Sequence, residues 1–200
     1  MKWGVIGAST IASEWMIDAI RARGGAIEVL CSGSGEHARE FALKHHIPEV
    51  VTRPEDFESF SLDAVYVSSI NHLHLKQVEI CALLGLHVLC EKPLTLDLNE
   101  AQSMLQICSN AGVQLGTNHH LRYAATHQRM RELIGEGAIG EILSARVFHA
   151  VHLPPHLQGW RIKAPEQGGG VVVDIAVHNA DLLSVTMGGY PEQVQSMTSV

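Results

Sequence analysis

Residues 87–94 read HVLCEKPL, a mostly apolar run followed by a carboxylate, an ammonium and a proline. The apolar run predicts a buried strand. Glu91-Lys92-Pro93 would be costly inside a strand, but it suits the carboxyl end of a parallel strand, where α/β sheets place their ligands. A lysine at such an end donates to an oxygen of a substrate or a sugar. The alternative is an ordinary strand-to-loop turn with a solvated lysine.

The start of the chain predicts a dinucleotide-binding turn between a strand at residues 2–7 and a helix that ends near Arg23. The sequence Gly7-x-Ser9-x-x-Ala12 approximates the G-x-G-x-x-G/A fingerprint. Gly7 permits the turn, and Ser9 is small enough to let the backbone approach a pyrophosphate. Ala12 allows the helix to pack closely on the strand. The N-terminus of the helix then faces the anion. A turn without a ligand is the alternative. The buried face of the helix is predicted to carry Ile11, Trp15, Ile17 and Ile20.

The end of the second predicted strand, residues 26–31, bears on the choice of cofactor. An NAD site usually has an acidic residue here, which binds the ribose 2′-hydroxyl. This chain has the neutral turn Ser32-Gly33-Ser34, with His37 and Arg39 soon after it. A hydroxyl-rich turn near cationic groups suits a 2′-phosphate, so we expect NADP and regard NAD as less favoured. The alternative is that the serines only cap the next helix and the arginine is solvated.

The remainder of residues 1–118 continues the alternation of strands and helices. Strands are predicted at 49–51, 62–69, 87–90 and 113–118, and helices up to 46, over 75–84 and over 96–111, the last capped by Asp97. Six strands alternating with helices describe a doubly wound parallel sheet, the Rossmann class of α/β fold. Asn71 and His74 follow the fourth strand, beside the expected cofactor, although the histidine has the alternative of capping its helix.

After Asn118 the sequence changes character, so we expect a second domain over residues 119–200. It is predicted to hold a helix over 119–136, a long strand over 142–150, and an irregular loop over 151–169. A helix follows in which Asp174 and His178 are four residues apart and share a face. A carboxylate that orients an acid/base histidine explains this pair; a satisfied core pair is the alternative.

Composition narrows the classes of function. A net charge of −7 argues against a nucleic-acid or anionic-membrane surface. We find neither a signal peptide nor a membrane-spanning segment in the sequence. The four cysteines lie in apolar runs without a Cys-x-x-Cys pair, which predicts reduced core residues of a cytoplasmic protein. No metal site is expected, because a metal needs more ligands than Asp174 and His178 supply.

Three features in this order resemble the Gfo/Idh/MocA oxidoreductases: the Gly7-x-Ser9-x-x-Ala12 turn, Glu91-Lys92-Pro93, and the Asp174-x-x-x-His178 helix. The resemblance covers the whole chain. It implies an NADP-linked Rossmann domain, a cis bond before Pro93, and a second α/β domain with an open, mainly antiparallel sheet that often forms oligomer contacts. Because family members run to two domains, it also implies that a chain ending at Val200 is a fragment or a truncated homologue.

The resemblance further assigns roles to residues. Lys92 is similar to the lysine that contacts the nicotinamide ribose and the substrate, and Asp174 and His178 match the carboxylate and the acid/base histidine. The residues expected to contact the cofactor are Gly7, Ser9, Thr10, Ile11, Ala12, Ser32, His37, Arg39, Ser69, Asn71, His74, Glu91, Lys92, Asn118, Trp160 and Arg161. Those expected to contact the substrate are Lys92, His149, Trp160, Arg161, Asp174 and His178.

The expected activity is reduction by NADPH of a ketone in a small sugar derivative. His178 would protonate the nascent alkoxide, Lys92 would polarise the oxygen, and Asp174 would hold the imidazole. Three alternatives remain: an NAD-dependent polyol or inositol dehydrogenase of the same family, a non-catalytic sensor of sugar or dinucleotide, and an inactive structural fragment.

Overall fold

The computed structural model describes residues 1–33, 35–150, 152–164 and 167–197, without the side chains of His156, Trp160 and Arg161. Ser34, in the predicted neutral turn, lies outside the described residues. The contacts divide the chain into two compact units. The first unit is Met1–Asn118 with Ala164–Gly168, and the second unit is His119–Lys163 with Gly169–Val200.

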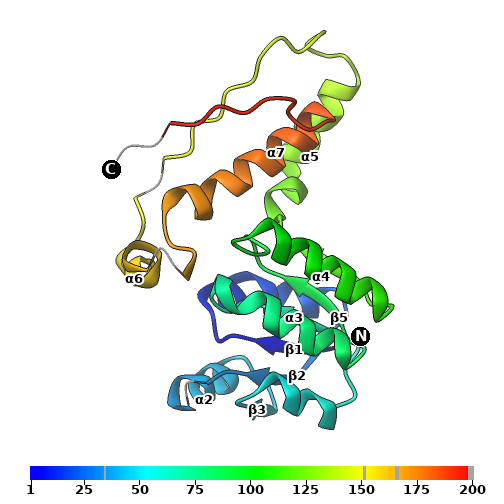
Figure 1. Cartoon of the computed structure of the whole chain (residues 1–200), viewed down its shortest axis with the longest axis vertical. Helices are drawn as coiled ribbons and strands as arrows, with labels where there is room; N and C mark the ends of the chain where they lie inside the picture. The colour runs from blue at the N-terminus through cyan, green and yellow to red at the C-terminus, as the bar shows by residue number, and fades with distance from the viewer. Residues whose placement is uncertain (34, 151, 165–166, 198–200) are drawn as a thin grey trace. The chain divides into compact units, whose positions relative to one another are not determined.

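The first unit is built on a six-stranded parallel sheet, which confirms the predicted Rossmann architecture (Figure 1). The strand order is β3-β2-β1-β4-β5-β6, so the winding reverses between β1 and β4, the place where such sheets bind ligands. The strands are β1 (Lys2–Ile6), β2 (Ala26–Cys31), β3 (Glu49–Val51), β4 (Ala64–Val67), β5 (His87–Cys90) and β6 (Leu115–Thr117).

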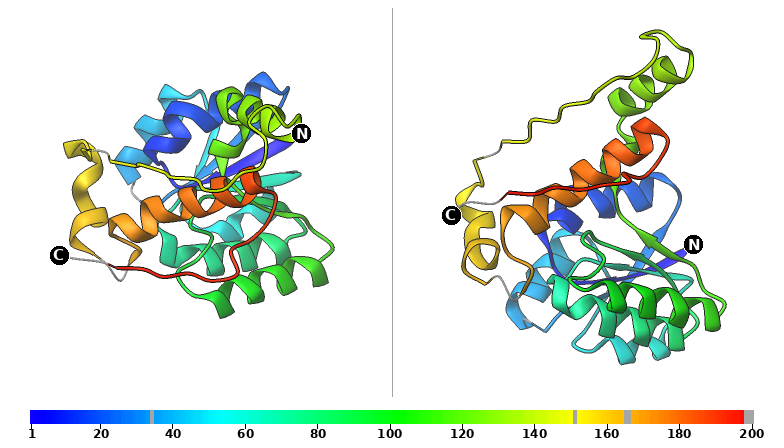
Figure 2. Two further views of the ribbon diagram at one scale, coloured as in Figure 1. Left: turned by 90° about the horizontal axis from the view of Figure 1, so that it is seen from above. Right: turned by 45° about the horizontal axis from the view of Figure 1, so that its top comes forward.

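Helices cover the sheet, and α3 and α4 lie side by side on one face (Figures 1 and 2). Asp97 caps α4 as predicted, because its carboxylate accepts from the backbone N–H groups of Asn99 at 2.8 Å and Glu100 at 3.2 Å. The helical elements are α1 (Ile17–Ala22), α2 (Gly35–Lys44), α3 (His74–Leu83) and α4 (Leu98–Asn110), with short 3₁₀ segments η2 (Pro54–Ser59) and η3 (Asn71–Leu73).

The first helix corrects one prediction, the inward orientation of Trp15, whose side chain is 67% exposed. Residues Ala12–Met16 form a π-turn, η1, ahead of α1. A π-turn adds one residue to the helical repeat, so Ala12 and Ile17, five apart, share the buried face while Trp15 turns outward. Ile17 and Ile20 are buried as predicted, and Ile11 is half-buried.

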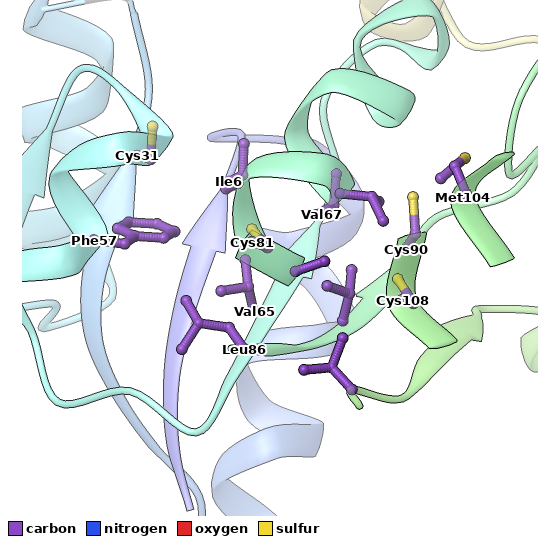
Figure 3. Close-up of a cluster of buried hydrophobic side chains, with 14 of the residues drawn as sticks. Ile6, Cys31, Phe57, Val65, Val67, Cys81, Leu86, Cys90, Met104 and Cys108 are labelled. Carbon is purple, nitrogen blue, oxygen red and sulfur yellow. The ribbon is translucent and has the colours of Figure 1, made fainter. Parts of the chain in front are cut away.

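Figure 3 shows the larger of the two core clusters, in which side chains from β1, β4 and β5 meet those of α3 and α4. All four cysteines are buried in this cluster as free thiols, which confirms the prediction that they are core residues. Burial raises the pKa of Cys31 and Cys81 to about 12, so these thiols stay protonated and act as small apolar side chains.

The described part of the second unit is helical. Its elements are η4 (His120–Tyr123), α5 (Ala125–Gly135), α6 (Pro155–Lys163), the π-turn η6 (Val172–Ala176) and α7 (Val177–Met187). The predicted helix over 119–136 is interrupted at Ala124, whose extended backbone (ψ 133°) separates η4 from α5.

The strand predicted at 142–150 is wrong for this structure. These residues form an exposed trace without regular structure (Figure 2). A strand needs a neighbour to satisfy its backbone hydrogen bonds, and the described residues of the second unit include no other strand. The open antiparallel sheet is therefore not formed in the part of the chain that the structure describes, and the oligomer contacts expected on that sheet stay a prediction.

The irregular loop predicted at 151–169 is also wrong in part, because residues 155–163 form α6. Pro155 begins this helix, and proline is favoured at the first helical position because its missing N–H is not needed there. Gly159 interrupts the helix with φ −2° and ψ −120°, a kink that glycine tolerates. No helix among the described residues is long and apolar enough to cross a membrane.

Candidate functional site

The candidate site in the first unit lies at the carboxyl ends of β1, β4, β5 and β6, which share one edge because the strands are parallel. A chain of hydroxyls crosses this edge between β1 and β4. The Ser9 hydroxyl accepts from the Ala12 N–H at 3.1 Å and donates to the Ser68 Oγ at 2.8 Å. The Ser68 hydroxyl in turn lies 3.2 Å from the carbonyl oxygens of Ile6 and Gly7. The Ser9 hydrogen is thus used within the protein, and Ser9 acts as a cap of the first helix.

Position 7 of this turn accepts only glycine. Its φ is +98°, and a Cβ built on it would lie 3.0 Å from the carbonyl carbon and oxygen of Ser68 and from the amide nitrogen of Ser69. The backbone of the turn therefore runs close against the end of β4, without side-chain atoms between them. The helix that follows begins at Thr10 and Ile11, so its N-terminus lies next to this turn. A cradle formed by the turn and the helix N-terminus fits the pyrophosphate of a dinucleotide.

The end of β2 carries the residues predicted to select NADP. Ser32 is half-buried, and its N–H donates to the Val51 carbonyl at 3.0 Å. The His37 Nε2 donates to the Ala8 carbonyl at 3.1 Å, which brings this imidazole onto the dinucleotide turn. Arg39 is exposed on α2, with its guanidinium near Gly35. The structure therefore brings Ser32 and His37 to the sheet edge and leaves Arg39 on the helix that follows.

The turn after β5 contains the predicted cis peptide bond between Lys92 and Pro93. The Glu91 side chain is buried, and its Oε1 accepts from the Tyr66 hydroxyl and from the Asn118 amide, each at 2.6 Å. Its Oε2 accepts from the Lys92 N–H at 3.2 Å. Glu91 and Asn118, both predicted as cofactor contacts, are thus engaged with each other beneath the turn, and Lys92 is half-buried above them.

His74 is placed differently from the prediction. Its side chain has no exposed surface. Its Nδ1 lies 3.1 Å from the carbonyl oxygens of Pro93 and Leu94, and its Nε2 lies 3.2 Å from that of Ser69. Burial lowers the pKa of His74 against the opposing effect of these three carbonyls. The ring therefore ties the ends of β4 and β5 together and presents no nitrogen at the surface.

The remaining predicted residues after β4 also hold the protein together. The Ser69 hydroxyl donates to the Gln77 Oε1 at 2.6 Å, and the buried Asn71 amide reaches the Gly168 carbonyl at 3.4 Å. Sequence reasoning missed Ser68 and Tyr66. The signal for both was a hydroxyl within a run of buried residues, where it needs a partner.

The second unit gathers imidazoles along α7. His178 is 7% exposed, and its ring meets that of His120 edge to face, with 5.2 Å between centroids and 75° between planes. Asp174 is half-buried in η6, where its N–H donates to the Gly170 carbonyl at 3.0 Å. His149 donates from Nδ1 to the Asn179 Oδ1 at 3.0 Å, which places it beside the residue that follows His178.

An ion pair that sequence reasoning missed attaches η4 to α7. The Arg122 guanidinium forms two hydrogen bonds with the Asp181 carboxylate, of which that from Nε measures 3.0 Å. The hydrogen bond and the charge of Asp181 raise the pKa of Arg122. The His119 Nδ1 lies 3.9 Å from the same carboxylate. The pair joins positions 59 residues apart, so periodicity gave no sign of it.

Trp160 and Arg161, predicted to contact cofactor and substrate, lie on α6, but their side chains are outside the described residues. Over the described part of the chain, no group of three His, Cys, Asp or Glu side chains is arranged to hold a metal ion.

The chain matches two models of one protein family. Residues 1–119 match the model described as an oxidoreductase family with an NAD-binding Rossmann fold, and residues 127–200 match the GFO/IDH/MocA C-terminal domain. The chain belongs to the Gfo/Idh/MocA oxidoreductase family.

Relatives agree with this assignment. The chain is 50% identical over 198 residues to the 1,5-anhydro-D-fructose reductase of Ensifer adhaerens, covering 98% of this chain and 60% of that protein. It is 30% identical to a D-xylose 1-dehydrogenase (NADP(+)) of Haloferax volcanii, of which it covers 61%. A 3-ketoreductase from Actinomadura kijaniata, solved with NADP and TDP-benzene, aligns with a TM-score of 0.82 at 28% identity, over 94% of this chain and 57% of that one. The chain thus spans about three-fifths of the length of these relatives.

Proposed function

We propose that the protein reduces a ketone of a small sugar derivative with NADPH, and that 1,5-anhydro-D-fructose, reduced to 1,5-anhydro-D-mannitol, is its substrate. The 50% identity to a 1,5-anhydro-D-fructose reductase carries this proposal. The alignment with that enzyme covers 198 residues, 98% of this chain, so the similarity extends over both units.

The preference for NADP rests on the turn after β2. Ser32 is neutral and half-buried, and the His37 ring is held on the dinucleotide turn by the Ala8 carbonyl. A carboxylate here would repel a 2′-phosphate, whereas a neutral hydroxyl can donate to it. The Gly7 cradle would hold the pyrophosphate, and Lys92 would contact the nicotinamide ribose.

Bound NADPH supplies the hydride. Lys92 donates a hydrogen bond to the ketone oxygen and polarises it, and His178 delivers the proton that this oxygen requires after reduction. Asp174 orients the imidazole of His178, and His149, Trp160 and Arg161 shape the sugar pocket.

The test is steady-state oxidation of the reduced cofactor by the full-length protein, with NADPH and NADH each paired with 1,5-anhydro-D-fructose and with a ketone of inositol. We expect the highest kcat/KM for NADPH with anhydrofructose. Preference for NADH and the inositol ketone would instead identify a polyol dehydrogenase. Quenching of nicotinamide fluorescence without oxidation would identify a sensor.

A single substitution tests the cofactor preference separately. Ser32→Asp places a carboxylate where NAD sites have one, so kcat/KM should fall for NADPH and rise relative to it for NADH. Gly33→Asp, one residue further along an exposed turn, is the matched control. Equal changes in both variants would remove the support that Ser32 gives to NADP.

We also propose that the protein works in the cytoplasm, which its four buried free thiols support, since an oxidising compartment favours disulfides. Fractionation of the source cells would test this.

A further inference from the structure

The turn that carries Lys92 is held on its amino side by a buried carboxylate. Glu91 is 7% exposed and receives three donors: the Tyr66 hydroxyl, the Asn118 amide and the Lys92 N–H. A carboxylate removed from water is costly unless such donors replace the water. The orientation of Glu91, and of the Lys92 N–H that it receives, therefore depends on the first two.

Tyr66 is the donor that reaches Glu91 from the neighbouring strand. It lies within β4, and in the register of β4 with β5 it is opposite Leu89, two residues before Glu91. Side chains two apart on a strand share a face, so Tyr66 and Glu91 meet on the same side of the sheet. The ring is fully buried in the second core cluster, and a phenylalanine would fill the same space. Only the hydroxyl, which donates to the Glu91 Oε1 at 2.6 Å, would be lost in such a change.

Burial and the neighbouring carboxylate raise the pKa of Tyr66 far above its ordinary value. The phenol therefore remains protonated at any pH at which the protein is folded, and it is always a donor to Glu91.

On its carboxyl side the same turn is held by His74, whose Nδ1 faces the Pro93 and Leu94 carbonyls at 3.1 Å. The backbone of Lys92 is thus held between two buried side chains, Glu91 before it and His74 after it.

We propose that Tyr66 is a positioning residue, which acts through Glu91 to set the direction in which the turn presents Lys92 to the substrate. The proposal rests on the proposed function, in which Lys92 polarises the ketone oxygen. Catalytic groups must be held closely, because a displacement of about 1 Å costs on the order of a hundredfold in rate. Tyr66→Phe removes one donor and leaves the core filled, so kcat should fall about ten- to a hundredfold while the affinity for NADPH stays unchanged.

Two measurements separate positioning from mere stabilisation. The first is a double-mutant cycle in the full-length protein with Tyr66→Phe, Lys92→Ala and both changes together. If Tyr66 acts through Lys92, the tyrosine change lowers kcat in the native background and has no further effect without the lysine. The second is hydrogen exchange of the Glu91, Lys92 and Leu94 amides without cofactor, which should become about tenfold faster in Tyr66→Phe. Tyr190→Phe, at a residue that is 90% exposed, is the control for both.

The outcomes are distinguishable. An unchanged kcat in Lys92→Ala overturns the proposed function. A large loss in Lys92→Ala with an unchanged kcat and unchanged exchange in Tyr66→Phe overturns only the positioning role, and so does an equal loss from Tyr66→Phe in both backgrounds. If Tyr66→Phe does not fold, Glu91→Gln tests the same bonds, because an amide keeps the volume and weakens acceptance from the phenol; native kcat in that variant overturns the proposal.

Discussion

The two units hold their polar residues by different means. In the first unit, the residues at the sheet edge follow strands whose backbones are fixed by the hydrogen bonds of the sheet. The strand ends are connected to one another by side-chain hydrogen bonds of Ser9, Ser68, Glu91 and His74. In the second unit, the histidines lie on helices and their neighbours are set by side-chain pairs, above all Arg122 with Asp181. The first site is therefore specified by backbone geometry and the second by charge, and substitutions should affect them differently.

The largest effect is expected from His178→Ala, which removes the proposed proton donor of the second unit. Loss of a general acid typically lowers kcat by about 10²–10⁴-fold. Binding of NADPH, proposed for the first unit, should not change. Turnover is measured by absorbance of the cofactor and binding by its fluorescence; a variant that turns over like the native protein would remove His178 from the mechanism.

Gly7→Ala should be the most damaging change to the first unit. A methyl group would lie 3.0 Å from the backbone of Ser68 and Ser69, at a φ of +98°. Strain of this kind costs about 1–3 kcal/mol, and the movement that relieves it would also disturb the cradle for the pyrophosphate. Both the free energy of unfolding and the affinity for NADPH should fall.

Gly33→Ala is the control for this change, because a Cβ there meets nothing within 4 Å. Equal unfolding free energies and equal NADPH affinities in the two variants would show that the turn tolerates a side chain, contrary to the site described.

Asp181→Asn tests the charge-based half of the comparison. The carboxylate is 8% exposed and receives two hydrogen bonds from Arg122, so neutralising it should lower the free energy of unfolding by about 1–2 kcal/mol. Glu132→Gln breaks an exposed pair with Arg129 and should cost less than about 0.5 kcal/mol. Denaturant titration compares the two, and an equal cost would mean that the buried pair does not fix η4 on α7.

The smallest effect is a pH dependence from His74. Its folded pKa lies below the ordinary value of 6.5, so the unfolded chain binds a proton before the folded protein does. Stability is present above pH 6.5 and is lost as the pH falls towards the lowered pKa. His74→Gln should reduce the decline in Tm on acidification, whereas His72→Gln, at an exposed position, should not. The pKa of His45 is also lowered, so part of the decline in Tm on acidification should remain in the His74→Gln variant.

The sequence predicted the sheet of the first unit because most of its strands are short apolar runs followed by glycine, serine or a charged residue. It also predicted that Ser9, Glu91 and Lys92 follow strands that end at one edge of the sheet, but it missed Ser68 there. It misplaced Trp15 because a π-turn shifts the helical phase and leaves no mark on periodicity. Tyr66 was missed because its partner lies 25 residues away, and only the strand register brings the two together.

The second unit was harder to predict for a related reason. Residues 142–150 have the composition of a strand, but strand formation depends on a neighbour that composition cannot supply. Likewise, nothing in the sequence near Arg122 or Asp181 predicts that they pair, because they meet only where η4 packs against α7. What the sequence does not encode locally is the pairing of distant segments.

The most direct test of the account is Lys92→Ala in the full-length protein, assayed for NADPH binding and for reduction of 1,5-anhydro-D-fructose. We predict that NADPH still binds, with only the Lys92 contact to the nicotinamide ribose lost, and that kcat falls by about 10²–10³-fold, as when one donor to a developing oxyanion is removed. Native turnover, or a loss explained entirely by weaker NADPH binding, would contradict the role of this sheet edge in the reaction.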